Sequence, residues 1–503
     1  MIAPLQVIIL LLIVAAFSSA PQRPPVAFSA SMVIVLVVLG HCALLFRAKR
    51  RFHRMSRDLQ SGLLSPTDMN MAIPKTVRQL MAMNTMLLAA DLWLFGFGWL
   101  VKFHWNLGRI PLLSSTIWLA APVMTWLAIW WLEYPLEIQI HRQTLATQGD
   151  EEPSTGFPTH PLPSRFQYVN MQFRHGLSLL LVLLAVDLLT IPLTALMNEW
   201  NLGYWSAIAS VLPVLVLLLV LPTIIVHYWR TTPLPGGPLR TRLESLARCN
   251  KVGFIDIRVW HTYYRIPNAA VLGLLAWTRY FLLTDLLLER LEPRQVEAVF
   301  AHEVGHGHHR HIWWYLLTFL AADLLGTGIS LWAGNVWSLS DNTVMLVNFS
   351  IVGVLVIFGF SRVSRMCEHQ ADWFAARHIA TVVAATTTPL MEGAAAYPAS
   401  TMDGHRQTVT LVNPDDPTPE TPAQAGARIF SESLSTLVGM ANRPRDRAGW
   451  MHPSMRDRVN LLAAMAESQY LQLRFNRRIN AMRIGIVIAA VAGAALTFWA
   501  ARG

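Results

Sequence analysis

The chain has 503 residues, of which 53% are hydrophobic and only 14% are charged, and its mean hydropathy is +0.39. This composition is typical of membrane proteins and excludes an ordinary soluble domain. We interpret the formal net charge of +10 as a sign of membrane topology and of contact with anionic lipids, not of nucleic-acid binding. The three cysteines do not make a disulfide framework.

Nine apolar runs predict membrane-spanning helices, because each approaches the roughly 20 residues that cross a bilayer. In chain order they lie at about residues 4–20, 27–46, 82–103, 111–133, 176–197, 204–228, 312–336, 343–361 and 482–500. The first run has the apolar core of a signal peptide, but it lacks a basic amino-terminal region, and Pro21 would follow the cleavage site. We therefore expect an uncleaved anchor.

Basic residues predict the orientation of these spans. The segment after the second run carries a cluster of Lys and Arg, which places it in the cytoplasm by the positive-inside rule. Alternation of the spans then places residues 47–81, 134–175, 229–311 and 362–481 on the inner side. We expect a multi-pass protein, of a bacterial inner membrane, whose catalytic residues face the cytoplasm.

Two of the inner segments, 148–164 and 394–426, have a composition that predicts loops without fixed structure. The predicted domains are a multi-span amino-terminal region at 1–230, a catalytic region at 231–480 and a carboxyl-terminal span at 481–503. A membrane hairpin at 312–361 and the insert at 394–426 interrupt the catalytic region.

Three short runs in the catalytic region predict β-strands. Residues Ile255–Trp260 alternate apolar and polar side chains, and Ala269–Leu274 and Arg279–Leu283 are rich in β-forming residues. Asn268 and Ala269 stand at the start of the second run, directly after a proline. They form either a plain turn or the start of an edge strand that binds a peptide through main-chain hydrogen bonds.

His302, Glu303 and His306 form the motif H-E-x-x-H. A preceding proline, Pro293, and apolar residues at helical spacing predict that the motif lies on a helix. Residues four apart share one helix face, so the two histidines can hold one Zn²⁺, and Glu303 can act as general base on a water that zinc activates. The motif alone is only suggestive, because short motifs also occur by chance.

A catalytic zinc site needs at least a third protein ligand. We expect Glu368, because the predicted hairpin returns the chain to the membrane surface that carries the H-E-x-x-H helix. Asp372, one helical turn further, can hydrogen-bond a ligand histidine. Taken alone, the two acids are equally typical of a solvated helix face. A Cys367 thiolate is a weaker alternative ligand.

Other polar residues carry less information. His308, His309 and His311 are interpreted as a basic, interfacial helix end and not as a second metal site. His452 and Arg458 precede an apolar helical run. They could neutralise the oxyanion of a tetrahedral intermediate, although their spacing alone favours a helix start with a solvated arginine.

Three acids, Asp91, Asp187 and Asp323, fall inside predicted spans, where an ionisable group is costly. Each of them either bonds to local groups or lines one wet internal chamber that opens toward His302 and Glu303.

The order H-E-x-x-H, then E-x-x-x-D, then H-P-x-x-x-x-R resembles the integral-membrane gluzincin zinc metallopeptidases, which include the type 1 CAAX prenyl endopeptidases and the heat-shock protease HtpX. The resemblance covers about residues 240–380 and 452–462, whereas the amino-terminal spans carry no matching motif. The chain departs from the heat-shock type in having more than four spans and a long insert before His452, which leaves the choice of substrate open.

This resemblance implies a mainly α, polytopic helical membrane protein with a zincin-type metallopeptidase domain that carries a small β-sheet. It also implies roles for individual residues: His302, His306 and Glu368 as ligands of one Zn²⁺, Glu303 as base, Asp372 as the partner of a ligand histidine, Asn268 and Ala269 on the substrate-binding edge strand, and His452 and Arg458 as helpers at the oxyanion.

We therefore expect a zinc metalloendopeptidase that hydrolyses peptide bonds of membrane or membrane-associated proteins at the cytoplasmic face, with no nucleic-acid partner. A narrower hypothesis is a CAAX-type prenyl-protein endopeptidase. A hypothesis of another class is a catalytically silent membrane scaffold with a retained metal site. Glu303 argues against the last, because a purely structural site has no use for a base.

Overall fold

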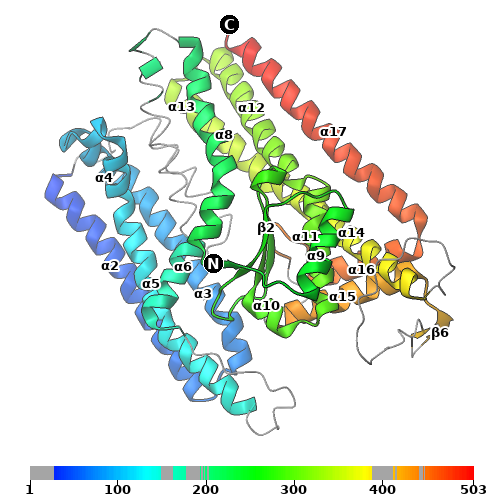
Figure 1. The fold of residues 1–503 in the computed structure, drawn as a ribbon. Coiled ribbons are helices and arrows are strands. Elements are labelled where there is room, and N and C mark those ends of the chain that lie inside the picture. The colour runs from blue at the N-terminus through cyan, green and yellow to red at the C-terminus, as the bar shows by residue number, and fades with distance from the viewer. Residues whose placement is uncertain are drawn as a thin grey trace. The chain divides into compact units, whose positions relative to one another are not determined.

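The computed structural model describes residues 28–148, 163–176, 193, 196, 197, 199, 200, 203–387, 412, 413, 416–440, 446 and 448–502. By their internal contacts these residues divide into two compact units. The first unit covers Met1–Thr231, His261–Tyr264 and Ala333–Gly353, and the second covers Thr232–Trp260, Arg265–Trp332 and Val354–Gly503. Helices dominate both units (Figure 1).

The first unit contains the long helices α2 (Ala30–Gln60), α3 (Pro66–Ala89), α5 (Pro111–Gln148), α6 (Arg165–Gly176), α8 (Gly203–Tyr228) and most of α13 (Asp341–Leu355). Short helical segments lie between α3 and α5: η1 (Ala90–Leu94), α4 (Phe97–Trp99), η2 (Leu100–His104) and η3 (Leu107–Arg109). Serine side chains cap α2 and α3, since Ser29 and Ser65 accept hydrogen bonds from backbone N–H groups in the first turn. Buried side chains of α2, α3 and α5, among them Ile73 and Ile129, form a common core.

Five helices within the described residues are long and apolar enough to cross a membrane: Ala30–Gln60, Thr116–Ile140, His311–Trp337, Thr343–Val382 and Gln469–Ala500. They cover the runs predicted at 27–46, 111–133, 312–336, 343–361 and 482–500. The run at 204–228 contains a shorter apolar helix, Leu212–Tyr228. The run at 4–20 and most of that at 176–197 lie outside the described residues. The predicted fold class, a mainly helical polytopic protein with a small sheet, is confirmed.

The run at 82–103 is not one straight span. Its two parts, Asp68–Leu94 and Phe97–His104, meet at an angle of 61°. The bend follows a π-helical turn, η1, and lies at Gly96, whose φ of +76° is readily adopted by glycine. The local cause of the bend is therefore this glycine, which the hydropathy pattern does not reveal.

Asp91, one of the three acids inside predicted spans, is buried in the first unit with a definite partner. Its Oδ2 lies 3.0 Å from Nε2 of His41, and Nδ1 of His41 lies 3.0 Å from the Thr125 hydroxyl. Only 1% of Asp91 is exposed, so its side chain is enclosed by the helices of this unit. Asp323 belongs to the second unit and is exposed, whereas Asp187 lies outside the described residues. The two described acids thus have different environments.

The second unit contains a four-stranded sheet, in which β1 (Thr231–Pro233), β2 (Asp256–Trp260), β4 (Tyr280–Thr284) and β3 (Ala269–Leu272) lie side by side in that order. Its helices are α9 (Pro238–Cys249), α10 (Asp285–Arg290), α11 (Pro293–His308), most of α12 (His311–Trp337), α14 (Ser361–Thr387), α15 (Pro422–Met440), α16 (Met455–Glu467) and α17 (Gln469–Ala500). Two short helical segments, η4 (Ala276–Thr278) and η5 (Val356–Phe360), complete it.

The sheet is mixed, because β2 pairs with β4 in parallel and β3 pairs with β4 antiparallel. The three strands β2, β3 and β4 match the predicted runs, except that β3 ends at Leu272. Gly273 follows with a φ of +103°, and a Cβ there would lie 2.1 Å from the carbonyl oxygen of Thr278, so a side chain is excluded at this turn. Because β3 is last in the order, one of its edges pairs with no described strand.

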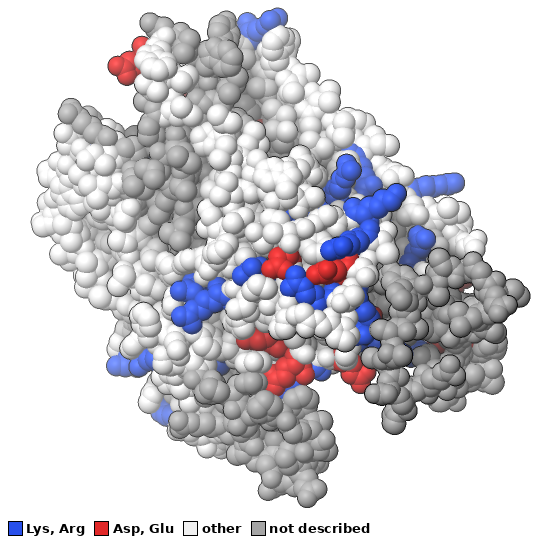
Figure 2. Space-filling model, in the orientation of Figure 1, with Lys and Arg blue, Asp and Glu red and all other residues white. Residues whose placement is uncertain are grey.

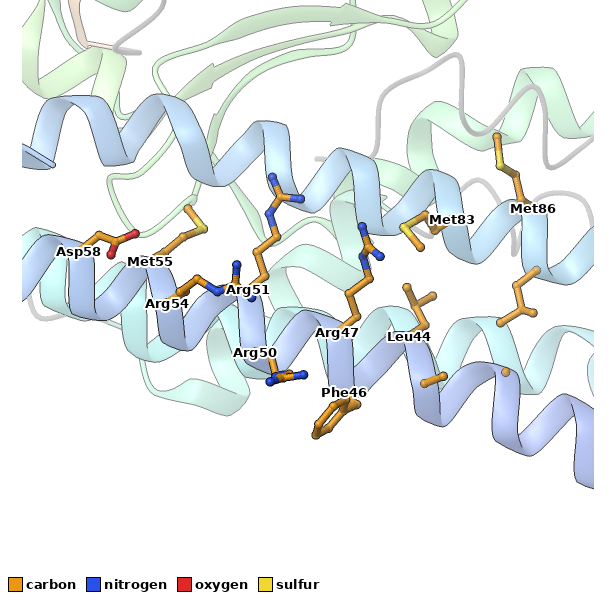
Figure 3. Close-up of a pocket in the computed structure, with 13 residues that line it drawn as sticks. Leu44, Phe46, Arg47, Arg50, Arg51, Arg54, Met55, Asp58, Met83 and Met86 are labelled. Atoms are coloured by element: carbon orange, nitrogen blue, oxygen red, sulfur yellow. The ribbon is translucent and has the colours of Figure 1, made fainter. Parts of the chain in front are cut away.

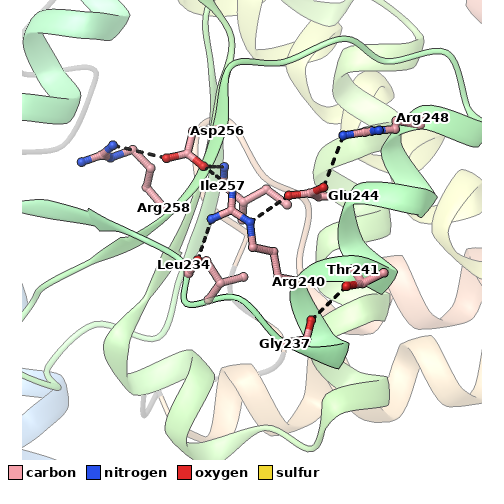
Figure 4. Close-up of polar contacts among 9 residues, drawn as sticks. All are labelled: Leu234, Gly237, Arg240, Thr241, Glu244, Arg248, Asp256, Ile257 and Arg258. Carbon is pink, nitrogen blue, oxygen red and sulfur yellow. Dashed lines mark hydrogen bonds and ion pairs between the residues drawn. The ribbon is translucent and has the colours of Figure 1, made fainter. Parts of the chain in front are cut away.

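Ion pairs fasten α9 to the sheet (Figure 4). The Arg240 guanidinium on α9 lies 2.7 Å from Asp256 on β2 and 2.8 Å from Glu244, and it also donates to the carbonyl oxygen of Leu234. The hydrogen bonds from Arg240 to these acids raise the pKa of its guanidinium. This network holds the strand next to β4 at a fixed position relative to the helical layer.

Helix α11 lies on α14 with almost no space between their backbones. A Cβ at Gly305 would lie 3.2 Å from the Cα of Ala371, and α14 is in turn approached by α15, where a Cβ at Gly426 would lie 2.3 Å from the carbonyl oxygen of Ala376. Phe300, fully buried, belongs to the core that these helices share with the sheet. The close packing brings side chains of α11 and α14 to one point.

Helices α12 and α17 also cross closely. A Cβ at Gly328 would lie 2.9 Å from the backbone nitrogen of Thr497, and one at Gly493 would lie 2.6 Å from that of Leu325. The Thr497 hydroxyl donates to the carbonyl oxygen of Leu324 across this crossing. Small residues and a side-chain hydrogen bond are typical of helix association in membranes. Figure 2 shows little charge over the upper length of α17 and a collection of Lys and Arg over its lower part.

The prediction that the insert at 394–426 lacks fixed structure is wrong for the second half of this segment. Residues Val412–Asn413 (β5) and Asp416–Pro419 (β6) pair as antiparallel strands, and α15 begins at Pro422. The Thr421 hydroxyl accepts from the backbone N–H of Gln424, and the Gln424 side chain accepts from the backbone N–H of Thr421. This capping box starts the helix inside a segment whose composition favours a loop.

Candidate active site

The H-E-x-x-H motif lies on α11, as its spacing predicts. Glu292 and Gln295 form a capping box at the start of this helix, and Pro293 occupies the first helical position. The buried face of α11 packs into the core through Val296, Val299 and Phe300. The helix therefore presents His302 and His306 on one face.

Three potential ligands converge on one point. Nε2 of His302 and Nε2 of His306 are 3.1 Å apart, and the carboxylate of Glu368 on α14 lies 3.8 Å from the first and 3.5 Å from the second. All three ligand atoms lie within 4.8 Å of one another, and each side chain is largely buried. Glu368 is thus not on a solvated helix face. The buried Cys367 does not belong to this group.

The donor set fits a zinc ion. Ligand atoms about 2.0–2.2 Å from a tetrahedral zinc ion lie about 3.3–3.6 Å apart. The two ligand nitrogens are 3.1 Å apart, Oε2 of Glu368 lies 3.8 Å from His302 and Oε1 lies 3.5 Å from His306, so small side-chain shifts would bring one oxygen to this spacing. Two nitrogens and one carboxylate oxygen are also the ligand types that catalytic zinc sites use.

Asp372 and Arg458 lie next to His302, with Asp372 at its Nδ1 and Arg458 also 4.0 Å from the Glu368 carboxylate. Oδ1 of Asp372 lies 2.9 Å from Nδ1 of His302, close enough for the carboxylate to favour a proton on this nitrogen. The Arg458 guanidinium on α16 binds both oxygens of Asp372, one of them through Nε at 2.8 Å. Burial would lower the pKa of Arg458, but Asp372 raises it, so the pair stays ionised. A proton on Nδ1 of His302 is therefore favoured, which leaves the Nε2 lone pair for a metal.

His306 has an equivalent support, His311, whose role the sequence did not indicate. Nδ1 of His311 lies 2.8 Å from Nδ1 of His306, and Nε2 of His311 lies 3.1 Å from Oε1 of Gln370. Arg483 on α17 donates to the same oxygen. Since arginine only donates, Gln370 presents its oxygen, and His311 must donate from Nε2 and accept at Nδ1. His306 then donates from Nδ1 and keeps its Nε2 lone pair free.

The interpretation of His308, His309 and His311 as a basic, interfacial helix end is therefore wrong in part. His311 is fully buried in the network just described. Burial lowers the pKa of His309 to about 3, so this residue is not basic either. Only His308 is exposed, with its Nδ1 3.1 Å from the carbonyl oxygen of Asn250.

Glu303 faces the edge strand β3. The backbone N–H of Val271 on β3 donates to its carboxylate. Burial raises the pKa of Glu303, His302 opposes this rise, and the charge of Glu368 adds to it. Burial and the neighbouring His302 lower the pKa of His306 to about 3, so this imidazole stays neutral. The site thus combines a carboxyl group of raised pKa with neutral imidazole.

His452 lies at the open side of the site. Its Nδ1 is 3.0 Å from the Glu368 carboxylate, and 57% of its side chain is exposed. The segment that carries it is anchored by Trp450, whose indole N–H donates to the carbonyl oxygen of Ile357 and whose ring stacks on Phe360. Ile357 and Phe360 belong to the π-helical turn η5, and the Ser361 hydroxyl donates to the Trp450 carbonyl oxygen. This anchor was not indicated by the sequence.

Asn268 and Ala269 lie at the start of β3. The backbone of Asn268 is bonded to Thr284 on β4, and its side chain is exposed. Ala269 is thus the first residue of the edge strand whose Val271 contacts Glu303, and Asn268 directly precedes it.

Comparison with known proteins agrees with this geometry. Residues 235–466 match the model of Peptidase family M48. The chain contains an M48 peptidase domain. The probable CAAX prenyl protease 1 of Schizosaccharomyces pombe is 29% identical over 187 residues, which are 32% of this chain and 37% of that protein. The protease HtpX homolog of Aeropyrum pernix is 34% identical over 139 residues, 27% of this chain and 43% of that protein.

The crystal structure of S. mikatae Ste24p is 14% identical, with a TM-score of 0.39 over 87% of this chain and 99% of that chain. Matches to the curated relatives span about two fifths of their length. The resemblance expected from the motifs is confirmed, and the M48 domain includes the whole group His302, His306 and Glu368.

Proposed function

We propose that this chain is a zinc-dependent endopeptidase, which hydrolyses peptide bonds of membrane or membrane-associated proteins at the cytoplasmic face. The observation that carries the proposal is the convergence of His302, His306 and Glu368 beside the half-buried Glu303. The M48 domain and the apolar helices support peptides and the bilayer as partners.

The unpaired edge of β3 is the proposed binding site for the substrate backbone. The backbone groups of Asn268 point toward β4, and consecutive residues in a strand direct theirs to opposite edges. Ala269 and Val271 therefore direct theirs to the free edge. A substrate strand could pair there with Ala269 and with the Val271 carbonyl, which places its peptide bonds beside Glu303.

The proposed chemistry assigns a role to each side chain. Zinc held by the two histidines and Glu368 would act as a Lewis acid and make water a nucleophile at neutral pH. Glu303 would take the proton of the attacking water and deliver it to the leaving amine. His452 and Arg458 would neutralise the negative charge that develops on the carbonyl oxygen. His452 is the more exposed of the two, whereas Arg458 is bound to Asp372 and also positions that acid.

Replacing the base separates catalysis from metal binding. In purified full-length protein, Glu303→Gln should abolish cleavage of a quenched peptide substrate while the zinc content stays at one ion per chain. Glu297→Gln is the matched control, because Glu297 lies on the same helix and pairs with Arg242. Full activity of Glu303→Gln would refute the mechanism. Loss of zinc with loss of activity in both variants would show only that α11 is damaged.

A CAAX-type prenyl-protein endopeptidase is the second candidate, because relatives from Schizosaccharomyces pombe and Arabidopsis thaliana bear the name CAAX prenyl protease 1. Cleavage rates of one peptide with and without a farnesyl group on its cysteine distinguish the two functions. A large preference for the farnesylated peptide supports the CAAX function. Equal rates support the broader endopeptidase.

We also propose a bacterial inner membrane as the location, with the site on the cytoplasmic side. The basic end of α2 supports this orientation by the positive-inside rule. Reporter fusions after Arg57, Pro153 and Asp415 should then report the cytoplasm, and one after Asp341 the outer side. A cytoplasmic signal at Asp341 would contradict the orientation.

A further inference from the structure

A groove between α2 and α3 in the first unit forms a cavity of about 1030 Å³. A second cavity of about 340 Å³ adjoins it, and the two share Arg47, Arg51, Met83 and Met86 in their walls. At one end the helices come together, since a Cβ at Gly40 would lie 3.0 Å from Cδ1 of Leu87. The groove is therefore a defined hollow between two packed helices.

The walls of the groove change from apolar to basic along α2. Leu44 of α2 and Met83 and Met86 of α3 line the apolar part, and arginines begin at residue 47. Figure 3 shows Arg47 and Arg51 extending from α2 toward α3, across the hollow. The change occurs where the apolar run of the predicted span ends, which is the depth of lipid headgroups.

The basic part lacks compensating charge. Four arginines line the larger cavity, Arg47, Arg50, Arg51 and Arg54, against one acid, Asp58. Within the part of the chain that the structure describes, no ion pair or hydrogen bond joins Arg47, Arg51 or Arg54 to another side chain. Arg47 and Arg51 stand four apart on one helix, where like charges repel. An anion between them would remove this repulsion and could be bound by both guanidinium groups.

We propose that this groove binds an anionic phospholipid, with its phosphate between Arg47 and Arg51 and an acyl chain along Leu44, Met83 and Met86. A free phosphate would leave the apolar wall without a partner. A lipid satisfies both parts, because basic pockets between membrane helices on the cytoplasmic side suit anionic headgroups. The volume is that of a ligand site and not of a packing defect.

Spin-labelled lipids test the proposal on the full-length protein in phosphatidylcholine vesicles. Wild type should immobilise labelled phosphatidylglycerol in preference to labelled phosphatidylcholine. The double variant Arg47→Gln/Arg51→Gln should reduce this preference about tenfold, since each basic residue contributes to anionic-lipid contact. The matched control, Lys49→Gln/Arg57→Gln, removes the same charge from the same helix end, and neither residue lines the cavities. It should lower the preference clearly less than the groove variant does, because it leaves the proposed phosphate site intact.

Two further measurements make the result decisive. Met83→Trp fills the apolar part without changing charge and should also reduce retention of the labelled lipid. Soluble glycerol phosphate should not displace it. Equal losses in both charge variants would overturn the proposal in favour of diffuse surface attraction. Displacement by glycerol phosphate, or an unchanged Arg47→Gln/Arg51→Gln variant, would overturn it as well.

Discussion

Replacing His311 by leucine should weaken zinc binding, although His311 is not itself one of the three converging ligands. The substitution removes the acceptor that lies 2.8 Å from Nδ1 of His306 and leaves that N–H buried without a partner. An unsatisfied buried donor costs about 1–3 kcal/mol. A free energy of that size corresponds to a factor of about 5–150 in affinity. Loss of an outer partner of a metal-bound histidine typically costs about 10–100-fold, so we expect zinc affinity to fall within that range.

The assay is competition for zinc between purified protein and a chelator of known affinity, with bound metal measured after separation. His308→Leu is the matched control, because His308 is on the same segment but exposed and bonded only to the Asn250 carbonyl among the described residues. It should hold zinc as wild type does. Gln370→Leu should have a smaller effect than His311→Leu, since Gln370 acts through His311. Wild-type affinity in His311→Leu would refute the assignment of the proton on His306.

Four other results are expected. Glu368→Ala should lose most of its zinc, whereas Asp372→Asn should weaken binding by about 10–100-fold, both by the same competition assay; an unchanged zinc content in Glu368→Ala would exclude it as third ligand. Trp450→Phe keeps the stacked ring but loses the hydrogen bond to the Ile357 carbonyl oxygen. Peptidase activity should fall several-fold while the zinc content stays unchanged. Activity equal to that of wild type would show that this anchor does not position the His452 segment. Burial raises the pKa of Glu303, and the base acts only when it is deprotonated. At saturating zinc, acidification should therefore abolish activity at a pH above the ordinary glutamate pKa of about 4.3. Loss of activity only at or below that pH would contradict the raised pKa.

The sequence predicted the members of the converging group and one neighbour, Asp372, but not His311 and its partners. His302, His306 and Glu368 could be grouped because helical spacing fixes one pair and the return of a membrane hairpin brings the third. His311 could not, because its position depends on a backbone turn. Arg310 adopts a φ of +56° between α11 and α12, which directs His311 back to His306. Hydropathy and spacing contain no signal for this conformation.

Other differences between expectation and structure have equally local causes. The insert was predicted as a loop because it has little apolar content, whereas the capping box of Thr421 and Gln424 starts α15 within it. The run at 82–103 has the hydropathy of a straight span, but Gly96 permits a bend. In both cases one or two residues determine the backbone conformation. Hydropathy or composition averaged over a sequence window does not reveal them.

Two residues that support the site lie far along the chain, so the order of synthesis determines when the site has all its contacts. Arg458, the partner of Asp372, is made 86 residues after it, and Arg483, the partner of Gln370, is made 113 residues after it. At about 5–20 residues per second, the ribosome adds the first of these intervals in roughly 4–17 s. During that time a nascent chain already carries the H-E-x-x-H helix and Glu368 but lacks the groups that hold Asp372 and His311 in place. The converging group therefore has its full set of supporting contacts only after Arg458 and Arg483 have been made, long after its own three side chains are present.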